Sequence, residues 1–161
     1  MRFTISVTIA TVCLFLSAAP RLHAEGPDIE TFLSTRPDFK KLAGDGALGH
    51  FYTLQDFLAD SAYTAERGDV VVTALVRGQE VIGFYVAVTV SAARFLYSDD
   101  ALAAIRRAYP EEHYKEVASG RVSDAANGGK GEILVSVYLR NASYEAIREE
   151  QLKTLGDKLE P

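Results

Sequence analysis

The stretch that decides the fold is DVVVTALVR (Asp69–Arg77), followed by Gly78-Gln79 and then EVIGFYVAVTV (Glu80–Val90). Both long segments are dense in β-branched residues, which favour strands. The glycine-first pair between them has the composition of a tight two-residue turn. The sequence therefore predicts a β-hairpin over residues 69–90.

The second strand of this hairpin is apolar on both sides. Its predicted core face consists of Ile82, Phe84, Val86, Val88 and Val90. The alternate residues are also largely apolar: Val81, Gly83, Tyr85, Ala87 and Thr89. A strand of this kind is expected in the middle of a sheet, with cover on both faces.

A further strand signal lies towards the C-terminus, in EILVSVYLR (Glu132–Arg140). Its alternation predicts one inward set, made of Ile133, Val135, Val137 and Leu139. Glu132, Ser136 and Arg140 are expected to point to water, on a face that Leu134 and Tyr138 interrupt. Residues 113–122 favour an irregular strand over an extension of the preceding helix, because they include Gly120 and many polar side chains.

Helical periodicity appears in the N-terminal part of the domain. Ile29, Phe32 and Leu33 share one helical face, and Phe39 and Leu42 share another after the helix-starting Pro37. Thr53 and Asp56 provide a capped, acidic start for a helix that buries Leu54, Phe57 and Leu58 and ends before Gly68.

Two more helices are expected downstream. One starts at Ser98-Asp99-Asp100, buries Leu102, Ile105 and Tyr109, and stops at Pro110. The other runs from Asn141 to about Leu159, and its predicted buried stripe is Tyr144, Ile147, Leu152, Leu155 and Leu159.

Together these elements predict an α+β domain with two layers. Strands joined by short loops pair antiparallel, and separate helices must cover a sheet face. The sheet is expected to have about four strands: the hairpin over 69–90, the strand 132–140 and a strand near 113–122. Without its first 24 residues the chain of 161 keeps 137, the usual size of one domain. We therefore expect a single domain over residues 25–161.

Residues 1–24 have the layout of a cleaved signal peptide. Arg2 precedes an apolar run over residues 3–19, and a short polar stretch ends at Ala24. Lipidation and an uncleaved anchor are the alternatives. The segment carries the only cysteine, Cys13, but Val12 stands before it where a lipoprotein signal needs a small residue. Hydroxyl side chains within the run favour cleavage over a membrane anchor.

The mature chain is acidic. The 17 basic residues lose Arg2 and Arg21, which leaves 15 against 22 acidic residues and a net charge of −7. Such a surface disfavours nucleic acid and anionic lipid, which attract Lys and Arg. A small exported domain without cysteine suits the bacterial periplasm, because secreted eukaryotic domains of this size rely on disulfides. We expect a periplasmic or secreted bacterial protein with no membrane anchor after cleavage.

The mature sequence contains no catalytic, cofactor or metal motif. Its histidines are His50 and His113, without ligand spacing. A G-x-S-x-G nucleophile motif is absent, and the glycines around Lys130 lack P-loop spacing. The cluster Glu111-Glu112-His113 has no ready structural explanation, although a surface turn is the simpler interpretation.

Two functions stay open on this basis. The first is a non-catalytic binding, inhibitor or accessory module for an envelope protein or a small ligand. Its candidate surface is Tyr85, Leu134 and Tyr138, which form an exposed patch if their strands are neighbours and no helix covers them. The second is a small hydrolase of an envelope polymer that uses the 111–113 cluster for acid/base chemistry. The lack of a catalytic motif favours the binding module.

Overall fold

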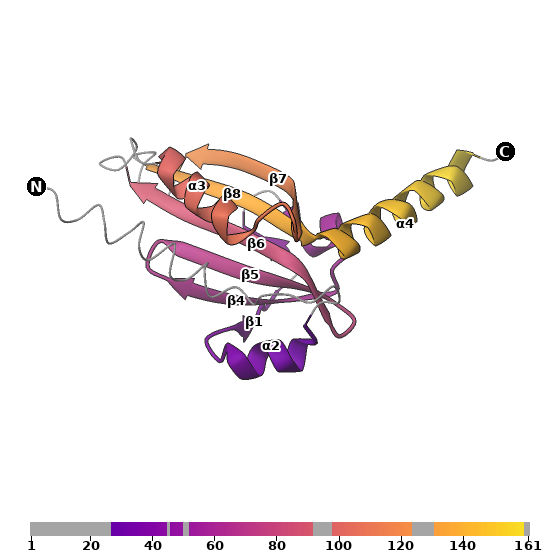
Figure 1. The fold of residues 1–161 in the computed structure, drawn as a ribbon, viewed down its shortest axis with the longest axis horizontal. Helices are drawn as coiled ribbons and strands as arrows, with labels where there is room; N and C mark the ends of the chain where they lie inside the picture. The colour runs from indigo at the N-terminus through magenta and orange to yellow at the C-terminus, as the bar shows by residue number, and fades with distance from the viewer. Residues whose placement is uncertain (1–26, 45, 50–51, 92–97, 124–130, 160–161) are drawn as a thin grey trace, which may run out of the picture.

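A six-stranded antiparallel sheet forms the centre of the computed structural model (Figure 1). The structure describes residues 27–44, 46–49, 52–91, 98–123 and 131–159, so the expected signal peptide lies outside the described residues. The strand order is β1 (Lys40–Lys41), β4 (Ser61–Arg67), β5 (Val70–Arg77), β6 (Glu80–Ser91), β8 (Gly131–Arg140) and β7 (Tyr114–Ser123). A separate two-stranded sheet pairs β2 (Ala47–Leu48) with β3 (Tyr52–Thr53).

The helices are α2 (Ile29–Thr35), the 3-10 turn η1 (Leu54–Phe57), α3 (Ser98–Ala108) and α4 (Asn141–Leu159). The predicted α+β class is therefore confirmed. The main sheet is larger than the four strands expected, because β1 and β4 extend it beyond the hairpin.

The hairpin predicted over residues 69–90 is present as β5 and β6. Arg77 pairs with Glu80 across a two-residue turn. Gly78 adopts φ +63° there, a left-handed conformation that glycine enters without steric cost. The other edge of β6 pairs with β8, so β6 lies inside the sheet as expected. The strands predicted at 132–140 and near 113–122 are confirmed as β8 and β7.

A β-bulge corrects the predicted core face of β6. The register between β5 and β6 shifts at Leu75/Val76, which leaves Ile82 without a partner in β5. An extra residue of this kind reverses the side-chain alternation of its strand. Val81 therefore packs with Phe84, whereas Ile82 lies on the opposite face of the sheet.

The helix expected from Leu54 to before Gly68 does not form. Only η1 follows Thr53, whose backbone N–H donates to Asp56 Oδ2 at 2.7 Å. Leu58 then adopts φ 51° and ends the turn. The chain continues as β4, which pairs with β5 along its whole length, because tertiary strand pairing outweighs the weak helical preference of the segment.

The segment after Pro37 is extended rather than helical. Lys40–Lys41 forms β1 on the outer edge of β4. Phe39 and Leu42 therefore do not share a helical face, and they pack against opposite faces of the sheet. The other predicted helices near Ile29 and from Ser98 are confirmed as α2 and α3.

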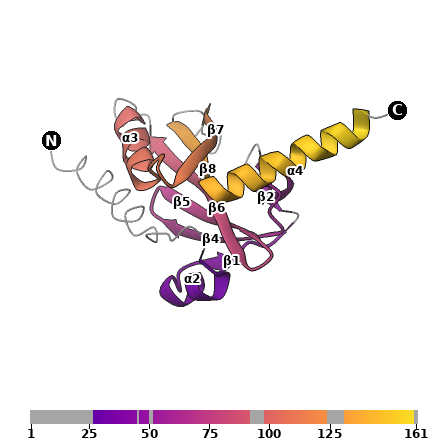
Figure 2. The same ribbon diagram turned by 45° about the vertical axis from the view of Figure 1, so that its right-hand side comes forward.

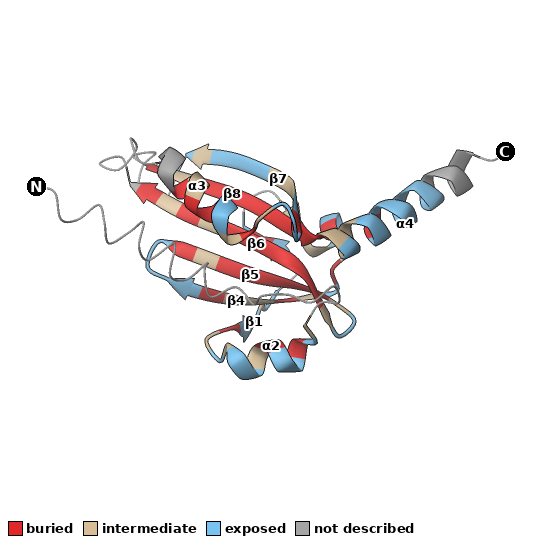
Figure 3. Cartoon of the chain, in the orientation of Figure 1, coloured by how far each residue is buried: buried red, intermediate tan, exposed pale blue. Residues whose placement is uncertain are grey.

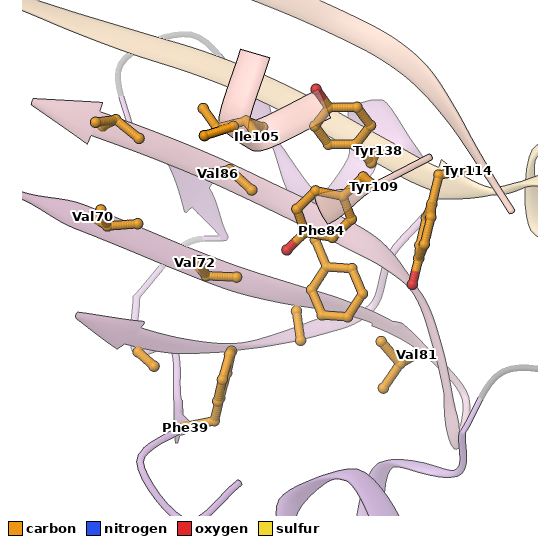
Figure 4. Close-up of a cluster of buried hydrophobic side chains, with 14 of the residues drawn as sticks. Phe39, Val70, Val72, Val81, Phe84, Val86, Ile105, Tyr109, Tyr114 and Tyr138 are labelled. Atoms are coloured by element: carbon orange, nitrogen blue, oxygen red, sulfur yellow. The ribbon is translucent and has the colours of Figure 1, made fainter. Parts of the chain in front are cut away.

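Both faces of the sheet are buried (Figure 3). The first core lies on the face that α2 and α3 cover, and Figure 4 shows part of it; its large side chains include Phe32, Phe39, Phe84, Ile105, Tyr109, Tyr114 and Tyr138. The second core lies on the other face, with side chains from β2, η1 and the first turns of α4; it includes Leu48, Phe57, Leu75, Tyr85, Val137 and Ile147.

The face of β8 that was expected to meet water is covered. Ser136 and Arg140 are only 1% and 3% exposed, and Leu134 and Tyr138 belong to the first core. Side chains of α3 share the first core with Leu134 and Tyr138 and cover that part of the face. The charge of Arg140 stays paired, because its Nη1 donates to Glu80 Oε1 at 2.6 Å.

Helix α4 leaves the domain after its first turns (Figures 1 and 2). Ile147 is buried and Tyr144 packs against the second core, but Leu152 is 59% exposed. The predicted buried stripe therefore stops after Ile147, and the side chains of Leu155 and Leu159 lie outside the described residues. Within the described ranges, no helix is long and apolar enough to cross a membrane.

Candidate functional site

Three tyrosines from different elements meet in the first core (Figure 4). Tyr109 follows the last residue of α3, Tyr114 opens β7, and Tyr138 lies in β8. The rings of Tyr109 and Tyr138 are stacked, with centroids 4.7 Å apart and an interplanar angle of 11°. Tyr114 meets Tyr109 edge-on at 5.2 Å and 87°. Phe84 of β6 contacts Tyr109 and Tyr114 at 5.4 and 6.2 Å. We call Tyr109, Tyr114 and Tyr138 the tyrosine cluster.

The local sequence explains how two of these rings come together. Tyr109 still makes a helical bond, from its N–H to Ile105 O at 3.2 Å. Pro110 then ends the helix, because proline cannot continue the pattern of bonds. The carbonyl of Pro110 accepts from the N–H of Tyr114 at 3.0 Å. This tight connection brings residues 109 and 114 to neighbouring positions on the first core.

A pocket of about 640 Å³ opens beside the tyrosine cluster. The cluster and Tyr144 of α4 form its aromatic wall. The remaining lining residues are polar or charged and come from α3, the following turn, β7 and α4: Arg106, Glu111, Lys115, Glu116, Asn141 and Glu145. The volume lies within the range of ligand sites in proteins, roughly 300 to 1,000 Å³, and the lining of this pocket is mixed aromatic and polar.

The rim of this pocket offers charges of both signs. Arg106 Nε lies 3.5 Å from Glu116 Oε2, and Glu145 Oε2 lies 3.8 Å from Nη1 of an arginine one turn along α4. Glu111 and Lys115 are exposed and form no ion pair with any described residue. They are therefore available to a bound charge of either sign.

The cluster Glu111-Glu112-His113 forms an exposed turn at one side of the pocket. Asn141 holds this turn from the start of α4. Its Nδ2 donates to the backbone carbonyls of Glu111 and Glu112 at 3.2 and 3.1 Å, and its backbone N–H donates to His113 O at 3.0 Å. These bonds supply a structural explanation for the turn. Of its three side chains, only that of Glu111 lines the pocket.

The phenols of the tyrosine cluster are held in their neutral form. Burial raises the pKa of Tyr114 and of Tyr138 to about 12. Burial also raises the pKa of Tyr109 well above 10.0, and its two tyrosine neighbours add to that shift. At physiological pH these phenols are therefore neutral, and the hydroxyl of Tyr114 is buried and not open to the pocket.

The exposed patch expected at Tyr85, Leu134 and Tyr138 does not form. Their strands are neighbours in the sheet, but all three side chains are buried. Tyr85 lies in the second core, on the opposite face from the other two, and its hydroxyl lies against Gly49. Of the three, Tyr138 alone lines the pocket.

No group of three or more His, Cys, Asp or Glu side chains gathers in the described residues in a way that could hold a metal ion. His113 is exposed on the turn, and His50 lies outside the described residues. A scan against family models and searches of curated proteins and of solved structures find no match.

The sequence indicates Tyr138 only as part of an exposed patch, and it does not indicate the rest of the pocket. It predicts Tyr109 in the core, which the structure confirms, and it predicts Tyr144 in a buried helix stripe and Tyr114 in an irregular strand. A signal was present in YPEEHY (residues 109–114), where two tyrosines flank a proline-initiated turn. That motif does not reveal that β8 and α4 complete the site, because their contribution depends on the sheet order.

Proposed function

We propose that this protein is an exported, non-catalytic binding module of the bacterial periplasm. It holds an envelope protein or a small ligand in the pocket beside the tyrosine cluster. The observation that carries this proposal is the pocket itself, which is lined by four tyrosines and by Glu111 and Lys115, two charged residues without an ion pair to any described residue.

Tyrosine suits this task because it offers a large, rigid, apolar ring and a polar tip at a low cost in conformational entropy. Three of the four rings are packed into the first core, so the wall is preorganised before a ligand arrives. Preorganised sites lose less entropy on binding than flexible ones.

Export is supported by the N-terminal pattern of a basic residue, an apolar run and a small residue at 24. The mature charge of −7 also favours a protein or small-molecule partner over nucleic acid.

Site-specific photo-crosslinking in the native host tests this function. We would replace Lys115, on the pocket rim, with p-benzoylphenylalanine and irradiate intact cells. The matched control is the same replacement at Lys41, which is exposed in β1 at the opposite edge of the sheet. A discrete adduct from position 115 and none from position 41 is the expected result. Equal adducts from both positions, or none from position 115, would contradict a partner in the pocket.

A further inference from the structure

We propose that the ligand is an extended polypeptide segment that adds as a strand to the free edge of β7. The segment places an aromatic or long apolar side chain in the pocket beside the tyrosine cluster. This inference rests on the proposed function and specifies its ligand class.

The first observation is the position of β7 in the sheet. It runs over Tyr114–Ser123 at one end of the strand order and pairs with β8, and with no other strand in the part of the chain that the structure describes. An edge strand of this length presents a row of backbone N–H and C=O groups to a further strand. Adding a peptide strand to such an edge is a common mode of recognition, in which main-chain bonds give affinity.

The hydrogen-bond pattern indicates which groups face outward. The N–H of Asn141 donates to His113 O at 3.0 Å, and these two residues directly flank the paired ends of β8 and β7 and continue their register. Bonded and non-bonded pairs alternate in an antiparallel ladder. Lys115 is therefore also bonded to β8, whereas Glu116 turns its backbone groups outward. Past the register shift in β7, the same alternation turns the backbone groups of Ser119 outward.

The second observation is that the pocket adjoins this edge. Tyr114, Lys115 and Glu116 are consecutive in β7 and all line the pocket. Glu116 pairs with Tyr138 of the first core, while Tyr144 packs against the second core on the other face. The pocket thus reaches both faces of the sheet at the edge. Since successive side chains of a strand point to opposite faces, an added strand would place one side chain towards each wall.

The net charge of the protein, and not the pocket rim, favours a basic residue in the bound segment. On the rim, Glu116 and Glu145 are each paired with an arginine, and the exposed Glu111 and Lys115 carry opposite charges. The mature domain has a net charge of −7. A positive side chain next to the apolar anchor would therefore be attracted to the domain.

The test uses linear dodecapeptides of random sequence, displayed on phage and selected on the mature protein. Selected peptides are synthesised, and their affinities are measured by fluorescence anisotropy. We expect the enriched sequences to carry an aromatic or long apolar residue beside a basic one. Binding to Ser119→Pro should be weaker by roughly fivefold or more, because proline removes the outward N–H at an exposed position outside the pocket.

Two controls isolate the main-chain bonds. Ser119→Ala keeps the N–H and should bind within about twofold of the unchanged protein. One set of peptides is methylated on the odd-numbered backbone nitrogens and a second set on the even-numbered ones. One of the two sets should bind the unchanged protein roughly tenfold more weakly than the unmethylated peptides. This second measurement applies even if Ser119→Pro does not fold.

The outcomes separate this inference from the proposed function. Loss of binding in Tyr144→Ala, with no effect of Ser119→Pro or of N-methylation, overturns strand addition and leaves the pocket as the site. If no peptide is enriched, strand addition is also overturned. The crosslinking experiment at position 115 then still tests whether a partner binds in the pocket. Self-association of the mature protein that Ser119→Pro abolishes would assign the edge to a second copy and overturn the peptide.

Discussion

Tyr109 and Tyr138 stack with ring centroids 4.7 Å apart and planes only 11° from parallel. Tyr109 belongs to the connection after α3, and Tyr138 lies in β8. Their contact therefore packs the segment that links β6 to β7 against the sheet. Both rings also line the pocket. The same side chains therefore serve the core and the candidate site, and substitutions there would change stability and binding together. Useful tests must use residues that separate the two effects.

Tyr114→Phe should stabilise the protein by about 1 kcal/mol. The Tyr114 hydroxyl is buried and has no hydrogen-bond partner among the described residues, and removing a buried unsatisfied polar group while keeping the ring relieves a desolvation cost. Urea unfolding checks this expectation. The matched control is Tyr144→Phe at the partly buried wall of the pocket, for which we expect a change below about 0.5 kcal/mol. A Tyr114→Phe variant that is clearly less stable than the unchanged protein would mean that the hydroxyl is bonded.

Stability should fall in alkaline solution. Burial raises the pKa of Tyr114 and of Tyr138 to about 12, above the ordinary value of 10.0. A pKa that is higher in the folded state means that the folded state holds its protons more tightly. The resulting stability is complete below pH 10 and is lost as the pH rises towards 12.

Urea midpoints between about pH 8 and pH 12 measure this loss, and ultraviolet absorbance follows tyrosinate formation in parallel. We expect the midpoint to be level up to about pH 10 and to decline above it, with some tyrosines ionising only as the protein unfolds. A constant midpoint up to about pH 12, with all tyrosines ionising together, would contradict the buried cluster.

Gly83→Ala should destabilise the protein by at least about 2 kcal/mol. A Cβ at residue 83 of β6 would overlap the backbone carbonyl of Tyr138 and would lie 2.8 Å from Leu139 Cδ2. Both atoms belong to the adjacent strand β8, which cannot move without breaking the ladder. Gly120→Ala in the edge strand β7 is the control, because its added Cβ would meet no atom within 4 Å. Equal thermal midpoints for the two variants would show that the register of β6 and β8 differs from the one described.

Protein recovered from the native host should begin at Glu25 and carry no lipid. The N-terminal pattern of residues 1–24 motivates this expectation. Intact-mass spectrometry of the periplasmic fraction measures it. A mass that retains Met1, or a diacylglycerol adduct on Cys13, would exclude the predicted processing.

Local sequence signals predicted the elements that depend on near neighbours. The hairpin turn at Gly78, the helix ended by Pro110 and the alternation of β8 were all visible in short windows. The bulge at Ile82 was not visible in the sequence. Both alternating sets of side chains in β6 are apolar, so either set could form the core face. Strand β4 was missed because Leu54, Phe57 and Leu58 have helical spacing, although the chain leaves the helical conformation at the last of them.

The candidate site could not be predicted from the sequence for a different reason. Its walls come from α3, β7, β8 and α4, and their meeting depends on the insertion of β8 between β6 and β7. No local pattern encodes that order.

The most direct test of the pocket as the binding site compares two substitutions on one helix. Tyr144→Ala removes a pocket wall at the start of α4, whereas Leu152→Ala removes an exposed apolar side chain on the projecting part. The measurement is the affinity of the mature protein for the partner crosslinked at position 115, by isothermal titration calorimetry. We predict that Tyr144→Ala weakens binding at least about tenfold, or about 1.4 kcal/mol, and that Leu152→Ala changes it less than about twofold. Loss of binding with Leu152→Ala and not with Tyr144→Ala would contradict the account and place the interface on the projecting part of α4.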